Sequence, residues 1–580
     1  MMHVLEQFSK LFDKKQKRSV IFIVMLMVLG AFFETFGISL IVPLVAVVLD
    51  EKFFQTNTVV KNISALLGIE SVKVFVIYML VLLILIFIIK DLFLFFEYYI
   101  QQKFVCSSRV RVQKQLMESF LQRPYEFFLN ESTGNIQRSV IDDVNRSFML
   151  LNNVMTLFTE LIVCIAVLCA VIAVDTVMAI FVCIVLLAEV LLILTKVKPA
   201  MTRLGNNVRE VSAQINKWII QSVQGIKEIK VTGKQGFFVQ NYENHATKYA
   251  QMERKNQLIN NAPRLIIEAV TISAMLGLMV LLLLAGYSME NLLPQLSAFA
   301  VAAVRLLPSA NRISGSMNNL SLWKPNLDAL VENMGKLEEW ERKEGDLHVS
   351  GQAGKLSLKE SCELSDITYS YSEAEHNVLD HANMLIPVGK SIGIVGTSGA
   401  GKTTAIDILL GLLSPQGGRV LSDGKSIMDD YDWWLQQLSY IPQSIFLLDD
   451  TIAANVAFGH DMENIDEEQV RSALREAQLE EFIQSLPEGI FTKIGERGIR
   501  LSGGQRQRIG IARALYGNPE LLVFDEATSA LDNETEAAIM ESINALHGKK
   551  TLIIIAHRLT TIQGCDIVYR VDNKKIERER

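Results

Sequence analysis

The sequence lacks the features of a secreted, disulfide-stabilised protein. Its six cysteines among 580 residues are scattered, and no two have the spacing of metal ligands. Three of them lie in apolar runs, so we expect the cysteines to be small buried hydrophobic residues. The first long apolar run is too long for a signal peptide and has no A-x-A-like site, which argues against a cleaved leader.

Charge is sparse as well. Charged residues make up 21% of the chain and hydrophobic residues 50%, and the mean hydropathy of +0.27 is high for a soluble protein. The net charge of −7 is modest and argues weakly against nucleic acid as the main partner. The chain is also too long for a single core, so several domains are expected.

Long hydrophobic runs fill the first half of the chain. A membrane-spanning helix needs about 20 apolar residues, and several runs reach that length. We therefore expect an all-α transmembrane domain of six helices over residues 1–325. The predicted spans are at about 19–49, 72–104, 151–173, 176–195, 262–287 and 292–312.

The loops predict the orientation of these spans. Segments 105–150 and 196–261 are long, helix-forming and rich in lysine and arginine, whereas the opposite loops carry little net positive charge. The positive-inside rule then places both termini, the long loops and the second half of the chain in the cytoplasm. Within the long loops, residues 125–145 and 219–231 are equally compatible with short helices that dock on a cytoplasmic domain and with ordinary helical turns.

Three cations fall in or at the edge of the predicted spans, in the cytoplasmic half of the bilayer. These are Lys90, Arg264 and Arg305. One interpretation is structural, because such cations snorkel or pair with carboxylates such as Asp91 or Glu97. The other is a basic site for an anionic, phosphate-bearing head group drawn from the inner leaflet. The residues alone leave both interpretations open.

The second half of the chain has a different composition. Residues 326–358 are charged and are expected to form a solvated linker. From 359 to 580, short β-branched strands alternate with amphipathic helices, which predicts an α/β domain. Residues 396–404 read GTSGAGKTT and fit the phosphate-loop pattern G-x-x-x-x-G-K-[ST], between a predicted strand at 391–395 and a helical pattern at 404–413.

A phosphate loop binds nucleotide through its backbone N–H groups and the N-terminus of the helix that follows. We expect Lys402 to reach the β- and γ-phosphates of ATP, and the hydroxyl of Thr403 to ligate Mg²⁺. Further along, an apolar strand ends in Asp525 and Glu526. The first carboxylate suits a Mg²⁺ ligand, and the second can accept a proton from the attacking water.

Two more segments belong to this series. The glycines of 501–505, which read LSGGQ, precede an amphipathic helix and form a second helix N-terminus that can face an anion. The apolar strand 551–556 delivers His557 to the same predicted sheet edge.

With these motifs in place, the chain resembles an ABC exporter half-transporter of type IV fold over essentially its full length. Such a protein fuses one membrane domain to one α/β P-loop ABC nucleotide-binding domain. The resemblance implies an ATPase and translocase with ATP and Mg²⁺ as cofactors. It also implies a dimer, because in this family the signature motif of one chain covers ATP held by the phosphate loop of the other. No consensus position is degraded, so a homodimer would have two hydrolysis-competent sites.

The family pattern assigns a role to each matching position. The implied catalytic residues are the base Glu526, the switch histidine His557 and the Q-loop residue Gln443. The implied nucleotide-binding residues are Tyr371, which stacks on adenine, then Gly396, Thr397, Ser398, Gly399, Ala400, Gly401, Lys402, Thr403 and Thr404, and the signature residues Ser502, Gly503, Gly504 and Gln505. The implied metal ligands are Thr403, Gln443 and Asp525. Glu496 is implied to face the coupling helices.

In the membrane half, stretches 34–40, 262–264 and 305–312 resemble bacterial lipid-linked oligosaccharide flippases of the PglK type. In that family, basic residues of the transport cavity handle the pyrophosphate of the substrate. Arg264 and Arg305 fall on matching motif positions, whereas Lys90 replaces an arginine and loses its bidentate fork. This resemblance implies ATP-driven flipping of a polyprenyl-pyrophosphate oligosaccharide from the inner to the outer side of a bacterial inner membrane. It also implies a short external helix within 50–72.

Other functions remain open at this stage. A multidrug, lipid A or peptide exporter would carry the same nucleotide motifs. A peptidase-bearing exporter is disfavoured, since only 18 residues, none of them cysteine, precede the first predicted span. Intact Glu526 and His557 argue against an ATP-gated channel or regulator, and the apolar first half excludes a soluble DNA-handling ATPase.

Overall fold

The computed structural model describes residues 2–39, 47, 71–174, 195, 198–284, 289–348, 356–371, 376–526, 533–556 and 559–580. The chain forms two compact units. The N-terminal unit comprises Met1–Arg123 and Glu131–Trp340, and the C-terminal unit comprises Pro124–Asn130 and Glu341–Arg580.

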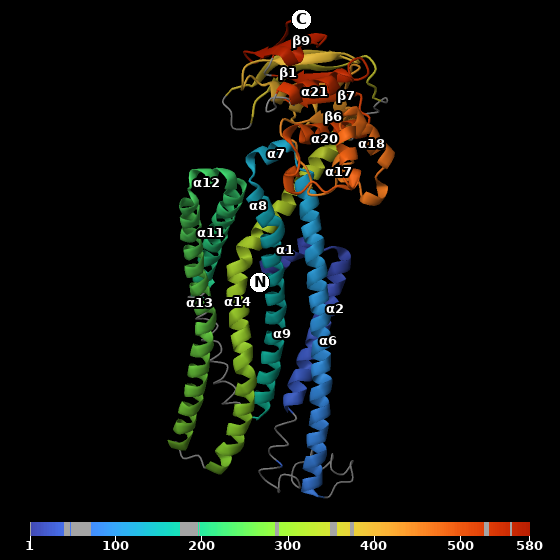
Figure 1. The fold of residues 1–580 in the computed structure, drawn as a ribbon. Coiled ribbons are helices and arrows are strands. Elements are labelled where there is room, and N and C mark those ends of the chain that lie inside the picture. The colour runs from blue at the N-terminus through green and yellow to red at the C-terminus, as the bar shows by residue number, and fades with distance from the viewer. Residues whose placement is uncertain are drawn as a thin grey trace. The chain divides into compact units, whose positions relative to one another are not determined.

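The described part of the N-terminal unit is helical (Figure 1). Its elements are α1 (Met2–Leu11), α2 (Lys14–Ser39), α6 (Val72–Leu121), α8 (Thr133–Arg138), the π-helical η1 (Ser139–Asp143), α9 (Val144–Val174), α11 (Lys198–Gln224), α12 (Ile226–Thr232), α13 (Gln235–Leu284) and α14 (Met289–His348). Helices α6 and α13 have 50 residues each and α14 has 60. At about 1.5 Å per residue, each is far longer than the roughly 30 Å of a bilayer core.

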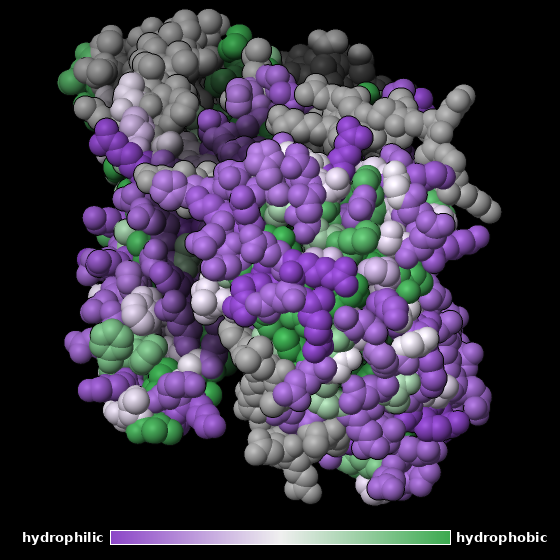
Figure 2. All heavy atoms as spheres, turned by 90° about the horizontal axis from the view of Figure 1, so that it is seen from above, coloured by the Kyte–Doolittle hydropathy of each residue, from purple (hydrophilic) through white to green (hydrophobic). Residues whose placement is uncertain are grey.

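Three described stretches are long and apolar enough to cross a membrane: Lys14–Phe36, Val72–Leu121 and Thr133–Cys169. Helix α6 leaves large apolar side chains exposed, with Leu92 65% and Phe95 71% accessible. That is the surface expected where lipid replaces water. The face of the molecule drawn in Figure 2 is by contrast mostly hydrophilic, with hydrophobic residues in scattered patches.

The predicted spans correspond to described helices to different extents. The span at 72–104 lies within α6, 151–173 within α9 and 292–312 within α14. The span at 262–287 overlaps α13 as far as its end at Leu284, and the span at 19–49 overlaps α2 as far as Ser39. Apart from residue 195, the span at 176–195 falls outside the described residues. Most of the predicted external segment 50–72 does so too.

A buried carboxylate ties three parts of the N-terminal unit together. Asp143, the last residue of η1, is fully buried. It accepts hydrogen bonds from Arg209 Nη2 of α11 at 3.1 Å and from Asn326 Nδ2 of α14 at 2.7 Å. Helices α11 and α14 also approach closely at Gly205, where a Cβ would lie 2.2 Å from the carbonyl oxygen of Leu322. Because losing one partner of a buried ion pair is costly, this node fixes η1, α11 and α14 relative to one another.

The C-terminal unit contains two sheets. A four-stranded antiparallel sheet has the order β2-β1-β4-β5, and a six-stranded sheet has the order β10-β9-β3-β8-β7-β6. In the larger sheet β6, β7, β8, β3 and β9 are parallel, and β10 is antiparallel to β9. The strands are β1 (Ser361–Tyr369), β2 (Leu379–Pro387), β3 (Ser391–Val395), β4 (Gly417–Ser422), β5 (Lys425–Ser426), β6 (Leu438–Ile441), β7 (Leu521–Asp525), β8 (Thr551–Ile555), β9 (Ile567–Asp572) and β10 (Lys575–Arg578).

Helices and short turns surround these sheets. The α-helices are α7 (Tyr125–Asn130), α15 (Lys402–Leu409), α16 (Tyr431–Gln437), α17 (Ile452–Val456), α18 (Glu467–Glu476), α19 (Glu480–Ser485), α20 (Gly503–Tyr516) and α21 (Asn533–Asn544). The 3₁₀ turns are η3 (Ile427–Asp430), η4 (Met462–Asn464), η5 (Gly489–Phe491), η6 (Glu496–Gly498) and η7 (Leu559–Ile562). Strands β3, β7 and β8 are buried along their whole length, as expected for central parallel strands covered on both faces.

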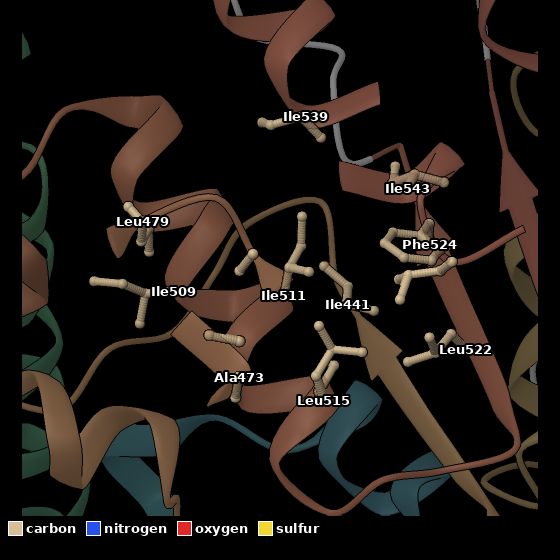
Figure 3. Close-up of a cluster of buried hydrophobic side chains, with 14 of the residues drawn as sticks. Ile441, Ala473, Leu479, Ile509, Ile511, Leu515, Leu522, Phe524, Ile539 and Ile543 are labelled. Atoms are coloured by element: carbon tan, nitrogen blue, oxygen red, sulfur yellow. The ribbon is translucent and has the colours of Figure 1, made fainter. Parts of the chain in front are cut away.

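One core cluster packs helices against strands β6 and β7 (Figure 3). Figure 3 shows Ile441 of β6 and Phe524 of β7 facing Ile511 of α20, with Ile543 of α21 on the same side. All four are at most 1% exposed. This packing confirms the predicted α/β core and holds α20, which carries the LSGGQ motif at its start, against the sheet.

Two predictions about the joints of the chain have distinct outcomes. Helix α7, within the expected docking segment 125–145, clusters with the C-terminal unit, whereas α12, within 219–231 and its neighbour Thr232, belongs to the N-terminal unit. The charged range 326–358 continues α14 as helix to His348, and the boundary between the units falls inside it, at Trp340.

The cysteines follow the prediction only in part. Cys164, Cys362 and Cys565 are buried and unpaired, but Cys106 and Cys169 are exposed. Both exposed thiols lie on helices of the N-terminal unit, where an apolar run in the sequence corresponds to an outward-facing surface rather than to a core.

The start of β1 is held by one carboxylate. Asp423 accepts hydrogen bonds from Ser357 Oγ at 2.7 Å and from the backbone N–H groups of Lys359, Glu360 and Ser361 at 2.9, 2.9 and 3.0 Å. Burial pushes the pKa of Asp423 upward, but these hydrogen bonds outweigh it and lower the pKa to about 2, from an ordinary 3.8.

We expect Asp423→Asn to lower the free energy of unfolding of the C-terminal unit by about 1 kcal/mol at pH 7, allowing for solvent screening at this partly exposed site. Because the folded-state pKa is depressed, the contribution is present above about pH 4 and is lost as the pH falls toward 2. Thermal unfolding should therefore separate variant from wild type at pH 7 and bring them together at pH 3. Asp429→Asn, at a nearby exposed aspartate, is the control. An equal gap at both pH values would contradict the assignment.

Candidate functional site

The predicted site residues gather at one edge of the six-stranded sheet. The phosphate loop follows β3, Glu526 follows β7, and Gln443 lies two residues after β6. These strands are parallel, so their carboxyl ends share an edge, and ligands bind there in open α/β sheets. The register is level, because Ile394 and Asp525 both lie opposite Ile555 of β8.

The phosphate loop depends on glycine at three positions with positive φ. Gly396, Gly399 and Gly401 have φ angles of 153°, 81° and 103°. A Cβ on Gly396 would lie 2.4 Å from the carbonyl oxygen of Val571, and one on Gly401 would lie 3.0 Å from Val378 Cγ1. Side chains rarely adopt such backbone conformations, and here they would also collide with their neighbours.

Lys402 begins α15 and is folded back into the loop. Its Nζ donates to the carbonyl oxygens of Gly396 at 2.9 Å and Thr397 at 3.0 Å, and the residue is only 6% exposed. The first N–H groups of α15 have no acceptor within the helix, and the helix end carries partial positive charge. The loop therefore combines a buried cation with backbone donors, which fits the phosphates of a nucleotide.

The two threonines that follow have different surroundings. Thr403 is exposed at the loop, whereas Thr404 is buried and its hydroxyl lies 3.0 Å from the hydroxyl of Tyr371. This contact fixes Tyr371, the predicted adenine-stacking residue, beside the phosphate loop. The hydroxyl of Thr403 thus fits a metal ligand, whereas the hydroxyl of Thr404 fits a structural link.

A pair of buried carboxylates lies behind the loop. Asp525 ends β7, is 7% exposed and accepts a hydrogen bond from Tyr440 Oη at 2.9 Å. Burial, helped by the nearby charge of Asp525, raises the pKa of Asp407 of α15 to about 6. Burial, with Asp525 adding to it, also raises the pKa of Tyr440, so the phenol stays protonated as a donor.

This arrangement fits a divalent cation completed by phosphate oxygens. The donor set of Thr403, Gln443 and Asp525 supplies hydroxyl, amide and carboxylate oxygens, which Mg²⁺ prefers. No group of three His, Cys, Asp or Glu side chains among the described residues could enclose a metal by itself. A cation beside Asp525 would also relieve the repulsion that raises the pKa of Asp407.

Glu526 is held outside the strand by its backbone. It has a φ of 48°, which is uncommon for a side chain other than glycine, and its N–H donates to the carbonyl of Ile555 at 3.1 Å. Its Oε2 accepts a hydrogen bond from Gln443 Nε2 at 2.8 Å. The structure therefore brings together two of the three predicted catalytic residues. His557 falls outside the described residues.

The signature segment forms a reciprocal helix cap. Ser502 is the N-cap of α20, its Oγ accepts from the backbone N–H of Gln505 at 3.2 Å, and Gln505 Oε1 accepts from the N–H of Ser502 at 2.8 Å. Ser502 and Gly503 are exposed, whereas Gly504 is buried. Within the described chain no hydrogen bond joins this segment to the phosphate loop.

The predicted cations of the membrane half are only partly described. Lys90 lies 3.1 Å from Asp91 and over the ring of Phe87 at 4.5 Å, with 13% of its side chain exposed. This favours the structural interpretation of Lys90. Arg264 lies on α13 and Arg305 on α14, and their side chains are outside the described residues.

Sequence reasoning missed three residues around the site. Tyr440 and Asp407 were not singled out, although each lies within three residues or one helical turn of a recognised motif. Tyr125 of α7 was not singled out either. Burial, followed by the charges of Asp407 and Tyr371, raises the pKa of Tyr125, which places α7 beside the nucleotide side chains. The aromatic start of the 125–145 segment was the available signal.

A parallel sheet edge with a phosphate loop and two strand-end carboxylates, on a chain that also carries long apolar helices, defines a P-loop ATPase of the membrane. Residues 20–302 match the family model for the ABC transporter transmembrane region, and residues 379–529 match the model for the ABC transporter ATP-binding region. The chain therefore belongs to the ABC transporter family. It is a half-transporter of exporter architecture, which binds and hydrolyses ATP and implies dimerisation in a membrane.

Individual relatives agree with this assignment. An "ATP-dependent lipid A-core flippase" of Cupriavidus pinatubonensis is 26% identical over 475 residues, which cover 81% of this chain and 79% of that protein. The "Heterocyst differentiation ATP-binding protein HepA" of a Nostoc species is 33% identical over 384 residues, which cover 65% and 61%. A bacterial Atm1-family ABC exporter, solved with ATP bound, has the same fold, with a TM-score of 0.75, 22% identity and coverage of 97% and 95%.

We expect Gly396→Ala to weaken ATP binding at least tenfold, because the new Cβ would collide with the carbonyl of Val571 and the φ angle is unfavourable for alanine. Titration with a fluorescent ATP analogue measures the loss. Gly517→Ala is the matched control, since a Cβ there meets nothing within 4 Å. Unchanged affinity in Gly396→Ala would show that the loop does not need glycine at this position.

Proposed function

We propose that this chain works as a homodimer that uses ATP hydrolysis to flip an anionic, diphosphate-bearing lipid-linked substrate across a bacterial inner membrane. Two parts support the proposal separately. The sheet-edge geometry supports the ATPase roles, and the basic residues of α13 and α14 support the substrate class.

In the ATPase part, Lys402 exchanges the carbonyls of Gly396 and Thr397 for the β- and γ-phosphates of ATP. Tyr371 stacks on the adenine, and the backbone of 396–404 surrounds the phosphates. Thr403, Gln443 and Asp525 hold Mg²⁺, which supplies charge neutralisation at the phosphates when it is bound.

Glu526 is the proposed general base. Its carboxylate is free to orient water once the amide of Gln443 turns toward the metal, and it accepts the proton as the γ-phosphate is attacked. The switch histidine His557 and the signature residues Ser502, Gly503, Gly504 and Gln505 complete the site from the family pattern. The signature of one protomer faces the phosphate loop of the other, so each ATP lies between two copies.

The substrate part depends on where the cations lie. Arg264 and Arg305 fall within the predicted spans, and an ionised side chain there faces a wet cavity or the bundle interior. Their motif context, 262–264 and 305–312, resembles lipid-linked oligosaccharide flippases of the PglK type. For such a substrate the costly step is moving a charged, polar head through hydrocarbon, and a basic wet cavity lowers that cost while the tail stays in lipid.

A lipid A exporter is the second candidate, and one observation favours it. The reported relative from Cupriavidus pinatubonensis is a lipid A-core flippase that aligns with 81% of this chain. Its substrate also carries phosphate on a lipid, so the two candidates share the need for a cationic cavity. They differ in the lipid, which is a polyprenol in one case and acylated glucosamine in the other.

We expect Glu526→Gln to reduce the turnover of ATP by a factor of about 10² to 10⁴ while leaving ATP binding intact, because the amide cannot take the proton. Phosphate release by the purified protein in liposomes measures turnover. Glu520→Gln, at a half-exposed carboxylate before β7, is the control for a glutamate-to-glutamine change that leaves the site untouched. Turnover in Glu526→Gln close to that of wild type would remove Glu526 from the base role.

The substrate class is tested by stimulation of the same ATPase. We expect undecaprenyl diphosphate to stimulate turnover, and lipid A or the hydrophobic cation tetraphenylphosphonium to do so weakly. Arg305→Ala should abolish the response to the diphosphate, since the anion loses a charge-assisted partner in a medium of low polarity. Stimulation by lipid A alone would select the second candidate, and a response to undecaprenyl diphosphate that survives Arg305→Ala would contradict the assigned role.

A further inference from the structure

A buried carboxylate in the N-terminal unit holds an arginine that the proposed function does not yet use. Glu160 of α9 is 3% exposed. Its Oε1 accepts a hydrogen bond from Arg312 Nη1 at 2.6 Å, and its Oε2 accepts one from Ser309 Oγ at 2.6 Å. Ser309 and Arg312 lie one turn apart on α14, and Ser309 is fully buried. The carboxylate thus grips α14 with both oxygens.

Arg312 itself is not buried with its partner. Just over half of its side chain, 53%, is exposed in the protomer. A guanidinium has five N–H donors, and among the described residues Glu160 is its one hydrogen-bonding partner. Arg312 ends the predicted span 292–312, where a charged group faces a wet cavity or neighbouring protein rather than lipid tails. Most of its donors therefore point to a space that an anion can enter.

The helix register connects Arg312 with the proposed transport site. Arg305 and Arg312 are seven residues apart on α14, which places them on the same helix face about 10 Å apart along the axis. From Glu160 to the end of α9 at Val174 the sequence has no further charged residue. The only carboxylate that this stretch of α9 offers to α14 is thus at the level of Arg312, not of Arg305.

We propose that Arg312 is a second anion-binding guanidinium of the transport site, positioned by Glu160 and Ser309. This inference rests on the proposed function, because it concerns the diphosphate head group. Arg312 meets the head group at the cytoplasmic end of the span, and Arg305 meets it two turns deeper. Glu160 holds one edge of the guanidinium and leaves the other edge for a bidentate contact with phosphate oxygens.

The competing possibility is that Arg312 serves only to neutralise Glu160. Removing one partner alone does not separate the two, since it leaves the other charge without compensation in a buried place. The double variant Glu160→Gln/Arg312→Gln removes both charges together and keeps two amides that can hydrogen-bond. Lys336→Gln, at an exposed lysine of α14 paired with Glu332, is the control for loss of one cation from the same helix.

The experiment uses the full-length protein in phosphatidylethanolamine–phosphatidylglycerol vesicles and measures ATPase stimulation relative to the basal rate of each variant. The probe is undecaprenyl diphosphate, and the readout is its half-maximal concentration. We expect the double variant to raise that concentration about tenfold or more, because charge-assisted hydrogen bonds are lost. Arg312→Lys should raise it about threefold, since it keeps the charge without the fork, and Lys336→Gln should leave it unchanged.

The outcomes separate the inference from the function on which it rests. If wild type does not respond to undecaprenyl diphosphate, the proposed function fails and the inference with it. If wild type responds and the folded double variant has the same half-maximal concentration, Arg312 only neutralises Glu160 and the inference alone is overturned. If thermal unfolding shows that the double variant does not fold, Arg312→Lys decides: a threefold rise supports the inference, and an unchanged concentration contradicts it.

Discussion

The contact of Lys402 with the carbonyls of its own loop is the interaction on which the C-terminal unit depends. A buried ammonium group needs partners, and Gly396 and Thr397 supply them at 2.9 and 3.0 Å. The loop can supply them only because glycine permits its φ angles and because β3 is pinned between β8 and β9. The same oxygen-lined loop becomes a phosphate cradle when the lysine turns outward, so the fold stores the site in a form that nucleotide can take over.

The sequence was sufficient to predict this part of the molecule. The strand expected at 391–395 is β3, and the helix expected from Thr404 begins two residues earlier, at Lys402. The motif sets both, since the glycines define the turn and the lysine lies at the helix start. What the sequence could not provide is contact between distant residues. The hydrogen bond from Tyr440 to Asp525 and the one between Tyr371 and Thr404 require the strand order, which local patterns do not contain.

The N-terminal unit shows the complementary limit. Hydropathy located the long helices, but it marked only where lipid-like composition begins and ends, so α6, α13 and α14 extend far beyond the predicted spans. Composition also gave no sign that Asp143 and Glu160 are buried and paired. Their partners, Arg209 on α11 and Arg312 on α14, lie dozens of residues or more away in the chain. Both carboxylates join helices that must keep their relative positions if movements at the ATP site are to reach the membrane.

The account as a whole requires that one chain cannot complete its own ATP site. This is tested most directly by combining two inactive protomers, one with Lys402→Ala and the other with Ser502→Arg. In a mixed dimer one site combines both defects, and the other joins an intact phosphate loop to an intact signature. We expect the mixed dimer to trap nucleotide with vanadate at one site, whereas each variant alone traps none. If the mixed dimer also traps none, while a wild-type dimer traps nucleotide normally, the shared site is contradicted.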